Sequence, residues 1–144
     1  MNTRYLNIAT TVSVAAQEHY GSAAQWARIG AGGHADDTAQ SPRLGPSETA
    51  FIRARDGFYL ASVSETGWPY IQYRGGPAGF LTTVDASMLG FADFRGNRQY
   101  ITTGNVRAND RVSLFLMDYA HRQPLKIFGH MRIIDAADDP VLAK

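Results

Sequence analysis

The feature that most constrains the fold is a series of six short segments after Gly57, each of which favours a β-strand. They span 58–64, 69–74, 79–84, 87–92, 111–118 and 124–134, and residues that favour tight turns separate most of them. Several segments are apolar on both faces, so both faces of the resulting sheet need a cover. We therefore expect a closed antiparallel barrel, with one face filled by core and the other covered by a helix or a second subunit.

The chain before Gly57 has a different character. Residues 10–29 are rich in Ala and place apolar groups at helical spacing, with an interruption at Gly21, which predicts one helix or two short ones. The Gly-rich stretch 30–35 matches a dinucleotide-binding pattern only formally, because it follows a helix rather than a strand, and we interpret it as a mobile linker. Ser47 is predicted to cap a short helix that runs to about Arg55. We expect a helical segment and linker over 1–45 and the main domain over 46–144.

Composition excludes several classes of function. The chain has no cysteine, which rules out disulfides, thiolate metal sites and a cysteine nucleophile. Its four histidines show no ligand spacing, so we expect no metal site, and neither a nucleophile elbow nor a Walker-type sequence occurs. A net charge of +1 gives no general attraction to nucleic acid or membrane. The N-terminus is too polar for a membrane span and poor as a signal peptide, which predicts a soluble, cytoplasmic protein.

The strand predicted over 69–74 carries the first candidate binding residues. A period of two places Tyr70, Gln72 and Arg74 on one face. Gln72 can donate and accept hydrogen bonds, as the edge of a pyrimidine-like ring requires, and Arg74 supplies charge for a phosphate or a reduced anionic ring. The alternative interpretation is a hairpin edge with solvated polar residues.

A second basic cluster follows at Arg95-Gly96-Asn97-Arg98. Asn97 is a suitable cap for a short helix over 100–103 that Gly104 would end. The start of a helix offers unpaired N–H groups and a positive dipole end, and Arg98 adds a full charge, so a phosphomonoester would fit there. The alternative is an ordinary capped helix with surface arginines.

One further cation stands in the last predicted strand. Apolar residues surround Lys126, with Leu125 and Ile127 on the opposite side of the strand. If the face of Lys126 looks onto a cofactor, its ammonium group would hold a negative charge there. The alternative is a lysine that extends from the surface of the barrel into solvent.

Taken together, these motifs resemble the pyridoxamine 5'-phosphate oxidase-like family of flavin-binding split barrels, over roughly Pro46 to Asp135. The resemblance is strongest in the segments 67–81, 91–98, 104–112 and 125–129. It implies a mainly β domain with peripheral helices: a six-stranded antiparallel split barrel with Greek-key-like topology, preceded by the N-terminal helical extension. It also implies a homodimer that binds flavin mononucleotide (FMN) in a groove between subunits.

The resemblance further assigns residues to the cofactor. Asn97 and Arg98 occupy the place of the basic pair that holds the phosphate in this family, and Arg95 or Arg74 is available to supply the missing charge. The strand that faces the flavin ring corresponds to 72–82, with Thr82 where pyridoxamine phosphate oxidases have a lysine. The backbone from Phe91 to Asp93 would line the groove.

The function implied is that of an FMN-dependent oxidoreductase, which transfers hydride through the flavin between a small-molecule substrate and an electron donor. The Arg-His substrate signature of pyridoxamine phosphate oxidases has no counterpart here, so we do not expect that specific activity. No catalytic side chain is assigned, because the flavin itself carries the hydride. Alternatives are a non-catalytic protein that binds flavin, haem or the deazaflavin F420, an enzyme that uses F420, and a purely structural dimerisation module.

Overall fold

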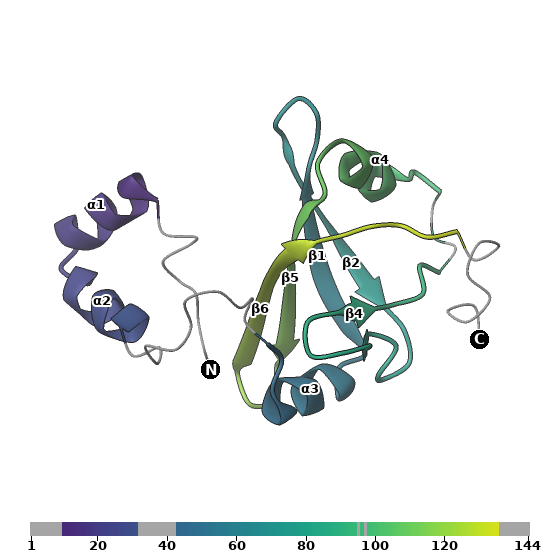
Figure 1. Cartoon of the computed structure of the whole chain (residues 1–144), viewed down its shortest axis with the longest axis horizontal. Helices are drawn as coiled ribbons and strands as arrows, with labels where there is room; N and C mark the ends of the chain where they lie inside the picture. The colour runs from purple at the N-terminus through teal and green to yellow at the C-terminus, as the bar shows by residue number, and fades with distance from the viewer. Residues whose placement is uncertain (1–9, 32–42, 95, 97, 136–144) are drawn as a thin grey trace. The chain divides into compact units, whose positions relative to one another are not determined.

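The computed structural model describes residues 10–31, 43–94, 96 and 98–135. The chain forms two compact units, Met1–Leu44 and Gly45–Lys144. Among the described residues, the first contains a pair of helices and the second contains all the strands (Figure 1).

The N-terminal unit contains α1 (Thr11–His19) and α2 (Ala23–Ala31). Thr10 caps α1, since its hydroxyl oxygen accepts a hydrogen bond from the Ser13 N–H at 3.3 Å. Gly21 lies between the helices with φ +77°, a conformation that glycine adopts at little cost. The prediction of helical structure interrupted at Gly21 is thus confirmed, with two helices. α2 includes the first two residues of the predicted linker, whose remaining residues lie outside the described part of the chain.

The second unit begins with α3 (Pro46–Arg53). Its N-cap is Gly45, so the prediction that Ser47 caps this helix is wrong. Proline at the first helical position has a suitable φ and needs no hydrogen-bond donor, and this moves the cap back to Gly45. The Glu48 carboxylate accepts hydrogen bonds from the Gly45 N–H and the Ser47 hydroxyl, both at 3.0 Å.

Four long strands make one antiparallel sheet in the order β2-β1-β5-β6. They are β1 (Gly57–Val63), β2 (Pro69–Gly75), β5 (Arg111–Asp118) and β6 (Gln123–His130). In the register of the sheet, Leu60 pairs with Gln72 on one side and with Leu114 on the other. The predicted strands at these places are confirmed, although the last one ends at His130 rather than at residue 134.

The two remaining strands are much shorter than predicted. β3 (Thr82–Thr83) and β4 (Leu89–Gly90) pair with each other as a separate two-stranded sheet. The fold is therefore mainly β with peripheral helices, as predicted. Among the described residues, backbone pairing does not join the six strands into one closed barrel.

The core lies on one face of the four-stranded sheet. Phe58, on β1, stacks on Phe80 with ring centroids 5.6 Å apart and meets the edge of Phe91 at 5.2 Å. These contacts hold the segments that flank β3 and β4 against the sheet. The buried apolar side chains are Ile52, Phe58, Leu60, Leu81, Val106, Val112, Leu114, Leu116 and Leu125.

The opposite face of the sheet is apolar as well, and much of it is exposed. Tyr59 on β1 pairs in register with Tyr73 on β2 and with Phe115 on β5. Ile71 and Phe128 extend this outer face along β2 and β6, and both are exposed. The prediction that strands are apolar on both faces is confirmed.

The last helix, α4 (Ile101–Ala108), lies beside the β1–β2 hairpin (Figure 1). It runs through Gly104, so the prediction that this glycine ends the helix is wrong. A side chain at Gly104 would meet nothing within 4 Å, and the chain leaves the helix only at Asn109, which has extended backbone angles. The N-cap is Tyr100, not the predicted Asn97.

Candidate functional site

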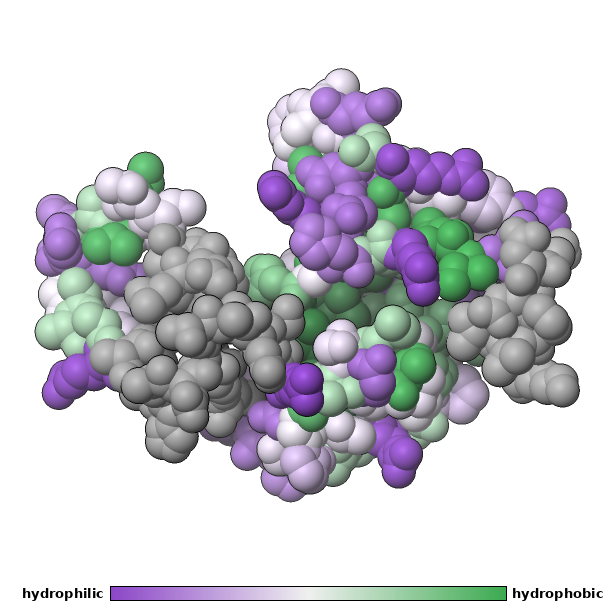
Figure 2. All heavy atoms as spheres, in the orientation of Figure 1, coloured by the Kyte–Doolittle hydropathy of each residue, from purple (hydrophilic) through white to green (hydrophobic). Residues whose placement is uncertain are grey.

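The inner face of β2 carries the predicted polar residues. Tyr70, Gln72 and Arg74 are half-buried, whereas Ile71 and Tyr73 between them are exposed. The predicted alternation is therefore confirmed, and the three side chains belong to the core side of the sheet. On the face seen in Figure 2, the molecule is hollowed between α4 and β4, and the floor of the hollow is apolar.

Gln72 contacts the first turn of α4. Its Oε1 accepts a hydrogen bond from the Thr102 hydroxyl at 3.2 Å, and Thr102 is only 2% exposed. This contact places the start of α4 directly beside β2.

Arg74 forms an ion pair with Asp93, which precedes α4 in the chain. The Arg74 side chain is 14% exposed and that of Asp93 is 47% exposed, so the pair lies at the rim of the buried region. The Nε of Arg74 is buried and has no hydrogen-bond partner among the described residues. An acceptor group would satisfy this donor, because a buried N–H without a partner is unfavourable.

The segment that leads into α4 has an unusual backbone. Arg98 and Tyr100 have φ values of +59° and +52°, in the left-handed region. No side-chain hydrogen bond caps α4 at Tyr100, so the first N–H groups of the helix lack that partner. Arg98 is exposed next to them, and the predicted phosphate ligands Arg95 and Asn97 lie outside the described residues.

A second side-chain hydrogen bond attaches α4 to β1, the neighbour of β2 in the sheet. The side-chain amide of Asn105 donates to the Ser62 hydroxyl of β1 at 3.0 Å. Ser62 is 2% exposed and follows Phe58 and Leu60 on the buried face of β1. Sequence reasoning missed Ser62, Thr102 and Asn105 as parts of this region. The signal available was Ser62 itself, a polar residue at an inward position of an apolar strand.

The other predicted site residues make different contacts. Thr82 is exposed in β3, and the ring of Phe91 packs in the core against Phe58. Lys126 pairs in register with Phe115 on the outer face of the sheet, and its Nζ lies 6.0 Å from the centroid of that ring. Within one chain, Lys126 is therefore on the opposite face of the sheet from Gln72.

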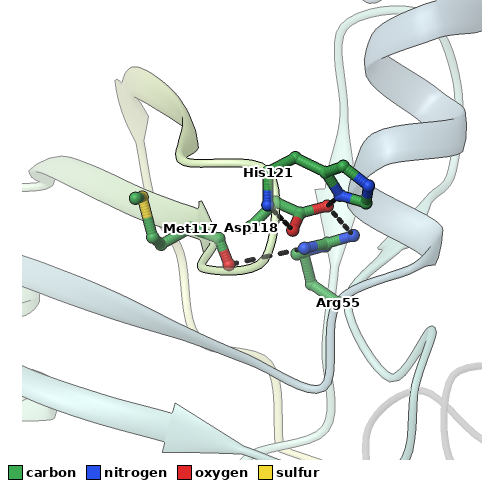
Figure 3. A network of polar contacts seen from close by, with 4 residues as sticks. All are labelled: Arg55, Met117, Asp118 and His121. Carbon is green, nitrogen blue, oxygen red and sulfur yellow. Dashed lines mark hydrogen bonds and ion pairs between the residues drawn. The ribbon is translucent and has the colours of Figure 1, made fainter.

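Another polar network joins two turns of the second unit (Figure 3). Arg55 lies 3.0 Å from the Asp118 carboxylate and donates to the Met117 carbonyl at 3.4 Å. The Asp118 carboxylate also accepts from the His121 N–H and lies 3.1 Å from the His121 ring. The His121 N–H, the His121 ring and Arg55 together lower the pKa of Asp118 to about 2. The network fastens the turn after α3 to the β5–β6 turn.

Two features are absent from the described residues. No helix among them has the length and apolar character required to cross a membrane. In the same part of the chain, His, Asp and Glu side chains do not gather in groups of three or more around a place for a metal ion.

Comparison with known proteins gives the family. The family model described as pyridoxamine 5'-phosphate oxidase matches residues 44–143. The crystal structure of a Lactobacillus delbrueckii protein, provisionally assigned as a pyridoxamine 5'-phosphate oxidase, aligns at 18% identity with a TM-score of 0.48. That alignment covers 62% of this chain and 67% of the other. A search of the curated proteins gave no significant match. Because the family model covers well over half of the sequence, including every strand, the chain belongs to the pyridoxamine 5'-phosphate oxidase family.

Proposed function

We propose that this protein binds FMN and acts as a flavin-dependent oxidoreductase. The observation that carries the proposal is the partly buried Arg74, whose Nε lacks a partner among the described residues. It lies on the same strand face as Gln72, which contacts the first turn of α4. Membership of the family supports the choice of flavin.

The residues present fit the chemistry of FMN. A phosphate dianion needs charged and neutral N–H donors, which Arg74, the first turn of α4 and the exposed Arg98 supply. The ring needs an apolar surface and a polar edge, which the hollow between α4 and β4 and the side chain of Gln72 provide (Figure 2). Arg95 and Asn97 are proposed as further phosphate ligands.

Bound flavin supplies a ring that accepts and releases hydride. The chain's own residues hold and orient it. We assign the phosphate to Arg74 and Arg98, and the ring edge to Gln72. The Asp93 carboxylate keeps the Arg74 guanidinium in place and offsets its charge while it is only partly solvated.

We also infer that two chains assemble into a homodimer through the outer face of the sheet, which would place the Gln72 and Arg74 site within each chain and not, as the resemblance implied, in a groove between subunits. Ile71, Tyr73 and Phe128 are 64%, 56% and 54% exposed on this face, and large exposed apolar surfaces mark contact sites. The packing of Phe58 against Phe80 and Phe91 supports a split barrel, in which the short β3–β4 sheet closes over the long one. Sedimentation of the wild type and of Ile71→Lys tests the dimer. We expect the variant to be a monomer, and a wild-type monomer would contradict the inference.

The first test of the function is the visible spectrum of the purified protein, with mass analysis of any chromophore that heat releases. A yellow protein that releases FMN and is reduced by an electron donor supports the proposal. Bound FMN that no reduced nicotinamide nucleotide can reduce would favour a non-catalytic carrier or sensor. Release of F420 or haem would replace FMN as the cofactor, and failure to bind any of the three would leave a structural module.

A further inference from the structure

The contact between Gln72 and Thr102 fixes more than the position of α4. A glutamine amide has an acceptor at one end and two donors at the other. Because Oε1 of Gln72 accepts the hydrogen bond from the buried Thr102 hydroxyl, the acceptor end is directed toward α4. The amide nitrogen is then the end available to a ligand.

We propose that Thr102 is a positioning residue that sets the polarity of Gln72, so that Gln72 acts as a hydrogen-bond donor to the bound cofactor. This inference rests on the proposed flavin function. It specifies that Gln72 recognises an atom that accepts hydrogen bonds, such as a carbonyl oxygen or an unprotonated ring nitrogen, and not the ring N–H.

The physical reason lies in the burial of Thr102. Its side chain is almost completely buried, so an unpaired hydroxyl there is unfavourable. If the Gln72 amide rotated by half a turn, its NH₂ group would donate to the Thr102 oxygen, but the buried hydroxyl hydrogen would lose the acceptor to which it is now donated. The buried hydroxyl therefore favours one amide orientation before any ligand arrives, which reduces the ordering cost of binding.

A second contact between α4 and the sheet offers a matched control. Ser62 is as buried as Thr102, and its hydroxyl also makes a side-chain hydrogen bond between α4 and the sheet, with Asn105. Ser62→Ala weakens the attachment of α4 to β1 but keeps the hydrogen bond from the Thr102 hydroxyl to Gln72. Thr102→Val removes that hydroxyl and keeps the side-chain shape, while Thr102→Ser keeps the hydroxyl.

The experiment measures two properties of the full chain and its three variants. The first is the NMR signal of the Gln72 side-chain NH₂ group without cofactor, and the second is the Kd for FMN. We expect Thr102→Val to shift or broaden the Gln72 signal and to weaken FMN binding roughly tenfold. Thr102→Ser and Ser62→Ala should leave the signal in place and the Kd within about twofold, although Ser62→Ala should lower the melting temperature as Thr102→Val does.

Two results would overturn the inference. One is an unchanged Gln72 signal and unchanged Kd in Thr102→Val, which would make Thr102 a purely structural residue. The other is an equal loss of affinity in Ser62→Ala, which would mean that the position of α4 matters and the amide polarity does not. If the wild type does not bind FMN, the proposed function fails, and the donor role with it. The Gln72 signal then still decides separately whether Thr102 orients the amide.

Gln72→Glu tests the polarity directly. The carboxylate keeps an acceptor for the Thr102 hydroxyl but has no N–H to donate. We expect Gln72→Glu to weaken binding more than Thr102→Val does. The loss should be seen with FMN and also with riboflavin, which lacks the phosphate. Affinity retained for both ligands would show that the cofactor needs no hydrogen bond donated by Gln72, contrary to the proposal.

Discussion

Replacing Arg74 with Gln tests the proposed phosphate site most directly. The change removes a positive charge that is mostly buried on the inner face of β2 and whose Nε lacks a partner among the described residues. A hydrogen bond to a charged group contributes about 1.5–3 kcal/mol, so the Kd for FMN should rise roughly 10- to 150-fold. Without cofactor, the free energy of unfolding should fall by no more than about 1 kcal/mol. The reason is that solvent screens the ion pair between Arg74 and the half-exposed Asp93.

The assay is titration of the cofactor-free protein with FMN and with riboflavin, alongside denaturant unfolding. Asp93→Asn is the matched variant, since it breaks the same ion pair but keeps the Arg74 guanidinium. Its amide oxygen can still accept a hydrogen bond from Arg74 and hold the guanidinium in place, so its affinity for FMN should stay the same or increase. Arg111→Gln removes an equal charge from an exposed position of β5 and should change neither affinity. Arg74 does not bind the phosphate if Arg74→Gln binds FMN as tightly as the wild type, or if the change weakens riboflavin binding equally.

Three further predictions concern the surroundings of the site. Arg98→Gly should relieve the strain of a left-handed backbone, so we expect unchanged or higher thermal stability. The same change removes a positive charge, so titration should show roughly fivefold weaker FMN binding. Gly104→Ala should raise the unfolding free energy by about 0.5–1 kcal/mol in denaturant melts, because the added methyl meets nothing within 4 Å inside α4, and a destabilised variant would contradict this. Because the folded pKa of Asp118 is lowered to about 2, its contribution should be complete above about pH 4 and lost as the pH falls toward 2. Thermal melts of Asp118→Asn should therefore show lower stability than the wild type at pH 7 and a difference that disappears near pH 2, whereas a constant difference would refute the role of the Arg55 and His121 contacts.

The four long strands were predictable from the sequence because their residue pattern is local. Alternation along 69–74 gave the inward face of Gln72 and Arg74 correctly, since period two is fixed by strand geometry alone. The errors came where two local rules compete. Pro46 moved the cap of α3 from Ser47 to Gly45, and Gly104 stayed inside α4 because helix termination depends on the backbone that follows and not on glycine alone.

Pairings at the site were not predictable, because they join residues far apart in sequence. Gln72 and Thr102 are separated by 30 positions, and Ser62 and Asn105 by 43. Which distant polar groups meet depends on where α4 packs, and no local pattern states that.

Ser62 nevertheless gave a local signal that the helix covering β1 has inward polar side chains. A hydroxyl that follows Phe58 and Leu60 on the buried face of β1 requires a partner. The helix that covers this face must therefore turn polar side chains inward. Thr102 and Asn105 are three residues apart, which places them on one side of a helix, and their inward direction identifies that side of α4 as the one that faces β1 and β2. Because the same contacts bring the start of α4 to Gln72, the polar residue inside the core and the candidate cofactor site have a common structural cause.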